Sequence, residues 1–209
     1  MFIRGNEVAN RGKSTGLIVL AIVVIGVLYV IGTYNSLIHL DQGTQSQWAE
    51  VENAYQRRLD LVPNLVATVK GAAAFEKSTY TAVAAVRANA GQVSPSTGAQ
   101  NDPAKFAQYQ KSQDNLSSAL SHLMVVVEAY PDLKATENFR DLQAQLEGTE
   151  NRITVARMRF NEAAQGFNSK RDSFPANVVA GLSSARFHDK IYFKADDQAA
   201  TAPKVSFQP

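Results

Sequence analysis

The chain has 209 residues, of which 45% are hydrophobic and 19% charged, which suits one compact domain with extensions or at most two small domains and excludes a disordered polyelectrolyte. It contains no cysteine, which excludes disulfides, thiolate metal sites, a cysteine nucleophile and an acylated-cysteine lipoprotein anchor. The net charge is +2, and the N-terminal arm supplies all of it through Arg4, Arg11 and Lys13 against Glu7. The remaining chain is neutral, which argues against nucleic acid as a partner, because binding to phosphates needs a surplus of Lys and Arg.

An uncharged apolar stretch close to the N-terminus predicts a membrane segment. The stretch 16–34 is uncharged and mainly aliphatic, and its length is close to the ~20 residues that a helix needs to span a bilayer. A cleaved signal peptide is the alternative, but such peptides have a shorter apolar run and an Ala-x-Ala-like exit, which this stretch lacks. We therefore predict a retained transmembrane helix over 16–34 after a short basic arm over 1–15, with Leu17, Ile25 and Tyr34 as anchoring residues.

The charges on the two sides of this segment predict its orientation. Basic residues precede it, whereas Asp41, Glu50 and Glu52 follow it before the first basic residue, Arg57. Because positive charge resists translocation, we expect a cytoplasmic N-terminus and an extracytoplasmic main domain, in a single-pass protein of the inner membrane whose first partner is the lipid bilayer.

After residue 35, apolar residues recur at spacings of three and four, and no strand pattern is present, so the sequence predicts an all-α fold. The clearest helix runs from Pro103 to about Val127, because Asp102 can cap its first N–H groups and Pro103 fits the first turn. Pro131 is expected to stop it. Its apolar stripe consists of Phe106, Tyr109, Leu116, Leu120, Leu123, Val127 and Tyr130, with Gln113 as a polar interruption.

Three further helices complete the prediction. One runs over 136–171, with an apolar seam at seven-residue spacing formed by Phe139, Leu146, Ile153, Phe160 and Phe167. Another continues from the membrane segment through Phe75 and on to Val83 and Val86, with a kink or break expected at Leu61 to Pro63. A short helix is expected over 175–182.

These elements predict an elongated antiparallel helical bundle of three long helices plus a short fourth over 35–194. A flexible loop is expected over 91–100, where Gly, Ser, Pro and Thr gather. Residues 195–209 are expected to form a loosely held C-terminal tail.

Three blocks carry a resemblance to a known family. They read RRLDLVPNL over 57–65, EAYPDLKA over 128–135 and LEGTENRI over 146–153. With these blocks the chain resembles the LemA family over about residues 34–193. The resemblance implies a single-pass bacterial membrane protein with an elongated antiparallel helical bundle, and it implies no known reaction.

No catalytic or cofactor motif is apparent. The histidines His39, His122 and His188 are far apart, without metal-ligand spacing. Neither a Gly-x-Ser-x-Gly elbow nor a nucleotide-binding glycine pattern occurs. We therefore expect no enzyme activity, no cofactor and no metal.

Charged side chains within or beside the apolar stripes predict a polar network inside the bundle. Its candidate members are Arg57, Arg58, Asp60, Glu76, Glu128, Glu150 and Arg157. Glu150 and Arg157 are two helical turns apart, too far to pair with each other, and half-buried charges cost several kcal/mol unless paired, so each needs a partner on another helix. Ion pairs that set the bundle register are the favoured interpretation, and a polar interior for ligand binding or acid–base chemistry is the alternative.

Two other features bear on partners. Thr154, Asn161 and Asn168 form a polar row at seven-residue spacing, which is either an interface to another subunit or solvated surface. Trp48, the one tryptophan, packs either in the bundle or at the lipid interface, and its register with Tyr55 favours the bundle.

The favoured function is a membrane-anchored scaffold or adaptor without catalytic activity that self-associates as a homo-oligomer, because small residues in the anchor and in the bundle permit close helix contacts. The alternative is a ligand-sensing or substrate-delivery module that partners a membrane protease or an envelope-remodelling enzyme. A third possibility is an enzyme that uses the carboxylates of Glu76, Glu128 and Glu150.

Overall fold

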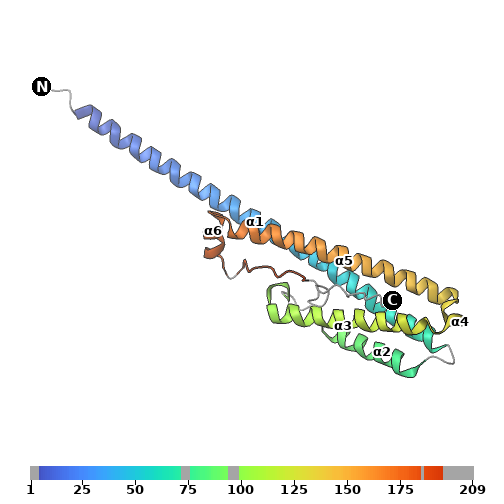
Figure 1. Ribbon diagram of the computed structural model, residues 1–209. Coiled ribbons are helices and arrows are strands. Elements are labelled where there is room, and N and C mark those ends of the chain that lie inside the picture. The colour runs from blue at the N-terminus through green and yellow to red at the C-terminus, as the bar shows by residue number, and fades with distance from the viewer. Residues whose placement is uncertain (1–4, 72–75, 94–98, 185, 195–209) are drawn as a thin grey trace, which may run out of the picture. The chain divides into compact units, whose positions relative to one another are not determined.

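The computed structural model describes residues 5–71, 76–93, 99–184 and 186–194, and it is helical as expected (Figure 1). The helices in chain order are α1 (Gly5–Lys70), α2 (Lys77–Gln92), α3 (Pro103–Val127), α4 (Pro131–Lys134), α5 (Glu137–Asp172) and α6 (Ala176–Leu182), with a 3₁₀ turn η1 (Ala99–Asn101) before α3. Within these described ranges no β-strand occurs, so the predicted all-α fold is confirmed.

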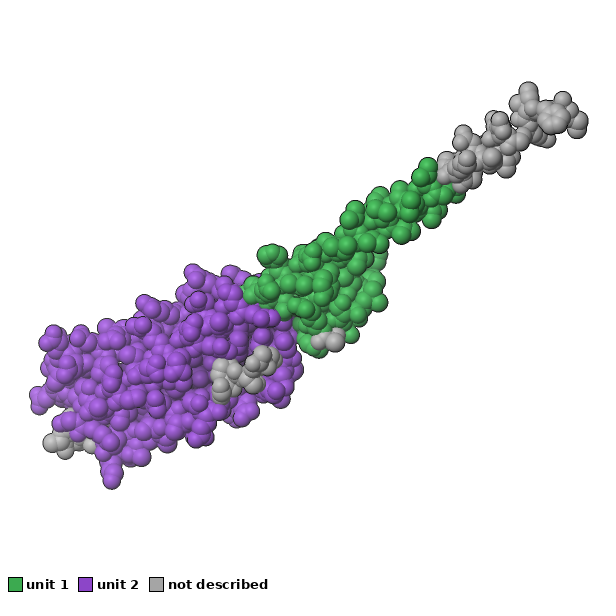
Figure 2. Space-filling model, turned by 180° about the vertical axis from the view of Figure 1, so that it is seen from behind, with its two compact units in different colours: residues 1–43, 166–188 green, residues 44–165, 189–209 purple. Residues whose placement is uncertain are grey.

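The chain divides into two compact units, coloured separately in Figure 2. Unit 1 consists of residues 1–43 and 166–188, and unit 2 consists of residues 44–165 and 189–209. Both α1 and α5 contribute residues to each unit. Unit 2 is the helical bundle proper, in which α2, α3 and parts of α1 and α5 pack in antiparallel fashion (Figure 1).

The first part of α1 is an apolar helix whose side chains are not buried by protein. From residue 15 to residue 32 every described side chain is exposed, with Leu17 at 68% and Ile25 at 66%. Among the described residues, α1 is the one helix that is both long enough and apolar enough to cross a membrane. Protein contact begins immediately afterwards, since Thr33 is 6% exposed.

α1 continues through Pro63 as one helix, so of the expected kink or break the break does not occur. Pro63 has no N–H group to donate to the carbonyl of Leu59, four residues earlier, so a helix hydrogen bond is missing there. The Arg87 side chain of α2 replaces it, because its Nε donates to the Leu59 oxygen at 3.0 Å. A long-range contact therefore satisfies the carbonyl that proline leaves free.

Arg87→Ala is expected to lower the free energy of unfolding by about 1 kcal/mol, since a charge-assisted hydrogen bond is lost and the Leu59 carbonyl is left without a donor. In a Pro63→Ala background the loss is expected to shrink, because the new N–H group can satisfy that carbonyl within the helix. Urea unfolding of the four chains in detergent, followed by the fluorescence of Trp48, measures this coupling. Equal losses in both backgrounds would contradict it.

The first bundle helix is shorter than expected. α1 ends at Lys70, and Val83 and Val86 belong to the separate helix α2. Phe75 lies outside the described residues, as do 94–98 of the expected loop and the expected tail over 195–209.

The other helices match their sequence patterns closely. The bounds of α3 are those predicted, and the Asp102 carboxylate caps it by accepting from the backbone N–H groups of Ala104 at 3.0 Å and Lys105 at 3.2 Å. Seven of the eight residues of its stripe are buried, as is the seam of α5, whereas Tyr130 is half-buried and lies after the end of α3. The predicted ranges of α5 and α6 agree with the structure to within one residue.

Two apolar clusters form the core of unit 2. One joins α1, α2, α3 and α5 around Leu65, Leu116 and Phe139. The other is aromatic and centres on Trp48, which is 5% exposed. Trp48 packs against Phe106, Tyr109, Phe160 and Phe193 at ring distances of 5.3–5.9 Å. The favoured position of Trp48 in the bundle is thus confirmed.

Residues 189–194 pass along the bundle without helical structure and are held by side chains of other elements. The Asn161 amide forms a pair of hydrogen bonds with the backbone of Phe193, each 2.9 Å long. Lys190, only 2% exposed, donates from Nζ to the Asn101 side chain at 2.9 Å. This segment places the Phe193 ring inside the aromatic cluster.

Candidate functional site

The most buried charge of the described structure belongs to Arg58, whose side chain is 1% exposed. It follows Tyr55 and precedes Val62 on the inward face of α1. Nη1 donates to Ser117 Oγ at 2.5 Å and to Glu150 Oε1 at 2.9 Å. Nη2 donates to the backbone oxygen and to the side-chain oxygen of Gln113, at 2.9 and 2.7 Å. Arg58 thereby joins α1, α3 and α5 at one point.

A second polar cluster lies around Arg157 of α5. Its Nε donates to the Tyr55 hydroxyl at 2.5 Å, and its Nη2 donates to Asp114 Oδ1 at 2.8 Å. The guanidinium groups of Arg58 and Arg157 lie 5.2 and 5.4 Å from the centre of the Tyr55 ring. Tyr55 therefore connects the two clusters, whose hydrogen bonds join α1, α3 and α5.

Burial raises the pKa of Tyr55, against the opposing effect of Arg157, and it raises the pKa of the neighbouring Tyr109 still further above the ordinary value. The two rings pack edge to face at 5.5 Å. Both hydroxyls therefore keep their protons in the folded chain at a pH where an unfolded tyrosine has lost its own.

This pKa difference predicts a loss of stability at alkaline pH. As the pH rises through the ordinary value of 10.0, the unfolded chain releases protons that folded Tyr55 and Tyr109 retain, so unfolding becomes more favourable. Each tyrosine contributes a fall of up to about 1.4 kcal/mol per pH unit. Between pH 9 and 10.5, the free energy of unfolding measured with urea is expected to fall less for Tyr109→Phe than for the wild type. Equal slopes in Tyr109→Phe and in the wild type would contradict the prediction.

The other charges predicted for the network lie at the surface. Asp60 is exposed and accepts a hydrogen bond from Gln56 at 2.8 Å. Glu76 is the residue before α2 and accepts from Thr79 at 3.5 Å. Glu128 is 64% exposed and pairs with Lys134 at 2.5 Å. The three carboxylates that would serve an enzyme, Glu76, Glu128 and Glu150, thus have separate partners and do not share a contact.

The residues of the predicted polar row have different surroundings. Thr154 is exposed and donates to the backbone oxygen of Glu150 at 3.1 Å. Asn161 is occupied by its hydrogen bonds to Phe193, and Asn168 is half-buried in unit 1. Asn161 therefore serves the fold of its own chain.

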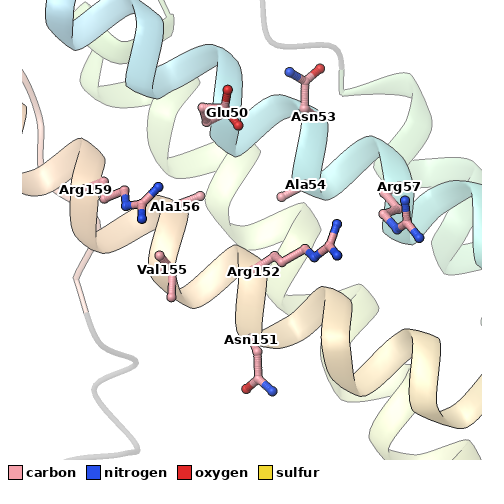
Figure 3. Close-up of a pocket in the computed structure, with 9 residues that line it drawn as sticks. All are labelled: Glu50, Asn53, Ala54, Arg57, Asn151, Arg152, Val155, Ala156 and Arg159. Carbon is pink, nitrogen blue, oxygen red and sulfur yellow. The ribbon is translucent and has the colours of Figure 1, made fainter.

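A groove of about 600 Å³ opens between α1 and α5 in unit 2 (Figure 3). Ala54 and Ala156 lie between the two helices, and the small side chains leave room above them. The polar residues that line the groove are Glu50, Asn53, Arg57, Asn151, Arg152 and Arg159.

Three of these side chains carry positive charge and have no hydrogen-bonding or ion-pairing partner among the described residues: Arg57, Arg152 and Arg159. In Figure 3 the Arg57 and Arg152 guanidinium groups approach the same gap from opposite helices. Glu50 is the one acidic residue that lines the groove, and it forms no ion pair within the described part of the chain. The groove therefore carries an excess of uncompensated positive charge.

Arg152 and Arg159 were not predicted as site residues, although they are seven residues apart and directly precede Ile153 and Phe160 of the apolar seam of α5. It also missed Gln113, Ser117 and Asp114 as partners, because a single helix pattern does not show which side chain of another helix lies opposite.

A comparison with protein families matches residues 47–207 to the model described as the LemA family. The chain belongs to the LemA family. The resemblance read from the three sequence blocks is thereby confirmed, since all three lie within the matched range.

Several relatives match this LemA family chain over most of its length. Magnetosome protein MamQ 2 of Paramagnetospirillum magneticum is 27% identical over 217 residues, covering 95% of this chain and 79% of the relative. Magnetosome protein MamQ of Magnetospirillum gryphiswaldense is 25% identical, with 94% and 80% covered. Protein LemA of Metamycoplasma hominis is 24% identical over 161 residues, with 76% and 69% covered.

Proposed function

We propose that the chain is a single-pass membrane-anchored helical scaffold that catalyses no reaction and self-associates in the cell envelope. The observation that carries this proposal is α1 itself, in which an exposed apolar stretch and one side of the bundle belong to the same uninterrupted helix. Such a helix anchors the bundle to a bilayer without a linker. The partnered charges around Arg58 and Arg157 agree with a structural role. The similarity to proteins named for the magnetosome supports a role at a membrane.

Single-cysteine labelling tests the anchor and its orientation, because the chain has no cysteine of its own. Asn10→Cys lies before the apolar stretch, and Ser121→Cys lies on the exposed face of α3. In spheroplasts, a membrane-impermeant maleimide is expected to label Ser121→Cys but to label Asn10→Cys only after lysis. The reverse pattern would overturn the orientation, and extraction of the chain from membranes at high pH would overturn the anchor.

Cross-linking in native membranes tests self-association. Amine-reactive reagents of increasing length are expected to give dimers and larger products of the full chain. A monomer at every reagent length would contradict the scaffold proposal.

The groove between α1 and α5 favours a second candidate function, the binding of an anionic ligand in a sensing or delivery module. Arg57 and Arg152 line the same gap without a partner of opposite charge among the described residues, and an anion bound between them would supply one. Arginine is well suited to this task, since its planar guanidinium group binds carboxylate and phosphate with two hydrogen bonds.

Calorimetric titration of the full chain in neutral detergent with tetraglutamate, and separately with inorganic phosphate, tests this candidate. A bound probe is expected to lose at least tenfold in affinity in Arg57→Gln/Arg152→Gln. The control Arg140→Gln removes an exposed α5 charge outside the groove and is expected to bind as wild type. No binding of either probe, or equal weakening in both variants, would count against a site.

A further inference from the structure

Three large apolar side chains in and beside α6 are exposed to an extent unusual for a folded domain. Phe174 and Leu182 are each 83% exposed, and Val178 is 56% exposed. Val178 and Leu182 are four residues apart and so share one face of α6, and Phe174 lies in the turn before the helix. The opposite face is buried through Ala176, Val179 and Ala180. Neighbouring exposed apolar residues of this kind mark an interaction surface.

The packing of unit 1 fixes where this surface lies along α1. Ala180 and Phe187 belong to one small core with Leu37 and Phe167, and the Phe187 ring lies 5.5 Å from the ring of Tyr34. The α6 region is therefore attached to α1 within two turns after its exposed apolar stretch.

The depth of this attachment follows from helix geometry. The exposed aliphatic run of α1 ends at Ile31, and a helix rises 1.5 Å per residue, so Tyr34 lies ~4.5 Å and Leu37 ~9 Å further along the axis. A bilayer has a hydrocarbon core of ~30 Å within a total thickness of ~40–45 Å, which leaves headgroup layers of ~5–8 Å on each side. If the apolar run fills the hydrocarbon core, Tyr34 lies within the headgroup layer and Leu37 just beyond it, so the small core that holds α6 begins at the level of the headgroups.

We propose that Phe174, Val178 and Leu182 form a second membrane contact, which inserts into the headgroup layer of the leaflet from which α1 emerges. This inference rests on the proposed membrane anchor. Helices with Phe or Leu side chains on an apolar face bind bilayers by lying in the interface plane with that face toward the acyl chains. Insertion would cover the three exposed side chains and add a second point of attachment to the spanning helix.

Depth-dependent quenching of single labels tests the proposal on the full chain in vesicles of phosphatidylcholine and phosphatidylglycerol. The environment-sensitive dye NBD is attached at Leu182→Cys, at Ile25→Cys in the apolar stretch, and at Gln42→Cys as an exposed control in the same unit. Gln42 lies ~16 Å beyond Ile31 along α1, which is past the headgroup layer. Trp48 fluorescence checks that each variant is folded.

The label at Ile25→Cys is expected to be quenched by nitroxides deep in the bilayer, and the label at Leu182→Cys by shallow nitroxides. Iodide in the water is expected to quench Leu182→Cys at least threefold less than Gln42→Cys. If Leu182→Cys behaves like Gln42→Cys while Ile25→Cys is lipid-embedded, the second contact is overturned and the anchor stands. Protection of Leu182→Cys from iodide without lipid quenching would mean coverage by protein and would also overturn the proposal. Exposure of Ile25→Cys to iodide would instead overturn the anchor.

Discussion

Replacing Arg58 with alanine is expected to lower the free energy of unfolding by about 3–5 kcal/mol, one of the two largest effects in the molecule. The substitution opens a cavity where α1, α3 and α5 meet, and it leaves the buried Gln113 side chain without its donor. The substitution also removes the packing of the aliphatic part of the arginine side chain, which adds to the cost of losing its charge. Urea unfolding of the full chain in detergent, monitored by Trp48 fluorescence, measures the loss.

Glu150→Gln is the matched comparison for Arg58→Ala. The Glu150 side chain is 42% exposed, so solvent screens its charge, and the amide oxygen can still accept from Arg58. We expect a loss of no more than about 1 kcal/mol. Equal losses in the two variants would show that the ion pair, and not the buried guanidinium with its packing, dominates at this position.

Trp48→Ala is expected to lower the free energy of unfolding by about 3–5 kcal/mol, because it removes the ring at the centre of the aromatic cluster of unit 2. Four aromatic rings contact Trp48, so the cavity is lined by large side chains that cannot easily close it. Far-ultraviolet circular dichroism during urea unfolding measures the effect, since the variant lacks its fluorescent reporter.

Trp48→Phe keeps an aromatic ring in the same place and is the control for Trp48→Ala. Its loss is expected to be clearly smaller, because most of the contacts with Phe106 and Phe160 persist. If Trp48→Ala unfolded at the wild-type urea concentration, the aromatic cluster would not contribute to the stability of the bundle.

Much of the fold was predictable because the determining signals are local. The bounds of α3 follow from a capping aspartate, a first-turn proline and an apolar stripe, all within 102–127. The buried seam of α5 follows from a seven-residue repeat. The exposed apolar stretch of α1 follows from composition alone.

Features that depend on contacts between helices were harder to predict. Pro63 predicts a kink or a break when its own helix is considered alone, and the donor that replaces the missing hydrogen bond, Arg87, comes from α2. The separation of α2 from α1 was missed for a similar reason, since the apolar spacing continues through both helices.

In the candidate sites, too, local spacing predicts which residues are buried but not which residues of other helices they contact. Arg58 shares the inward face of α1 with Tyr55 and Val62, and its inclusion among the buried charges follows from that spacing. Arg57 is adjacent in sequence but lies about 100° away around the helix, so it faces the groove instead. The identity of each partner depends on the register of three helices, which no single stretch of sequence specifies.

The position of Phe193 has a consequence for the order of assembly during synthesis. Phe193 comes from the segment after α6, yet its ring stacks on Trp48 of α1 with 13° between the ring planes. While the nascent chain is still emerging, the aromatic surface of the earlier helices stays open to chaperones and to aggregation. Arrival of this last segment completes the core, so a prematurely terminated chain would retain all its long helices and still present an unfinished surface to proteases.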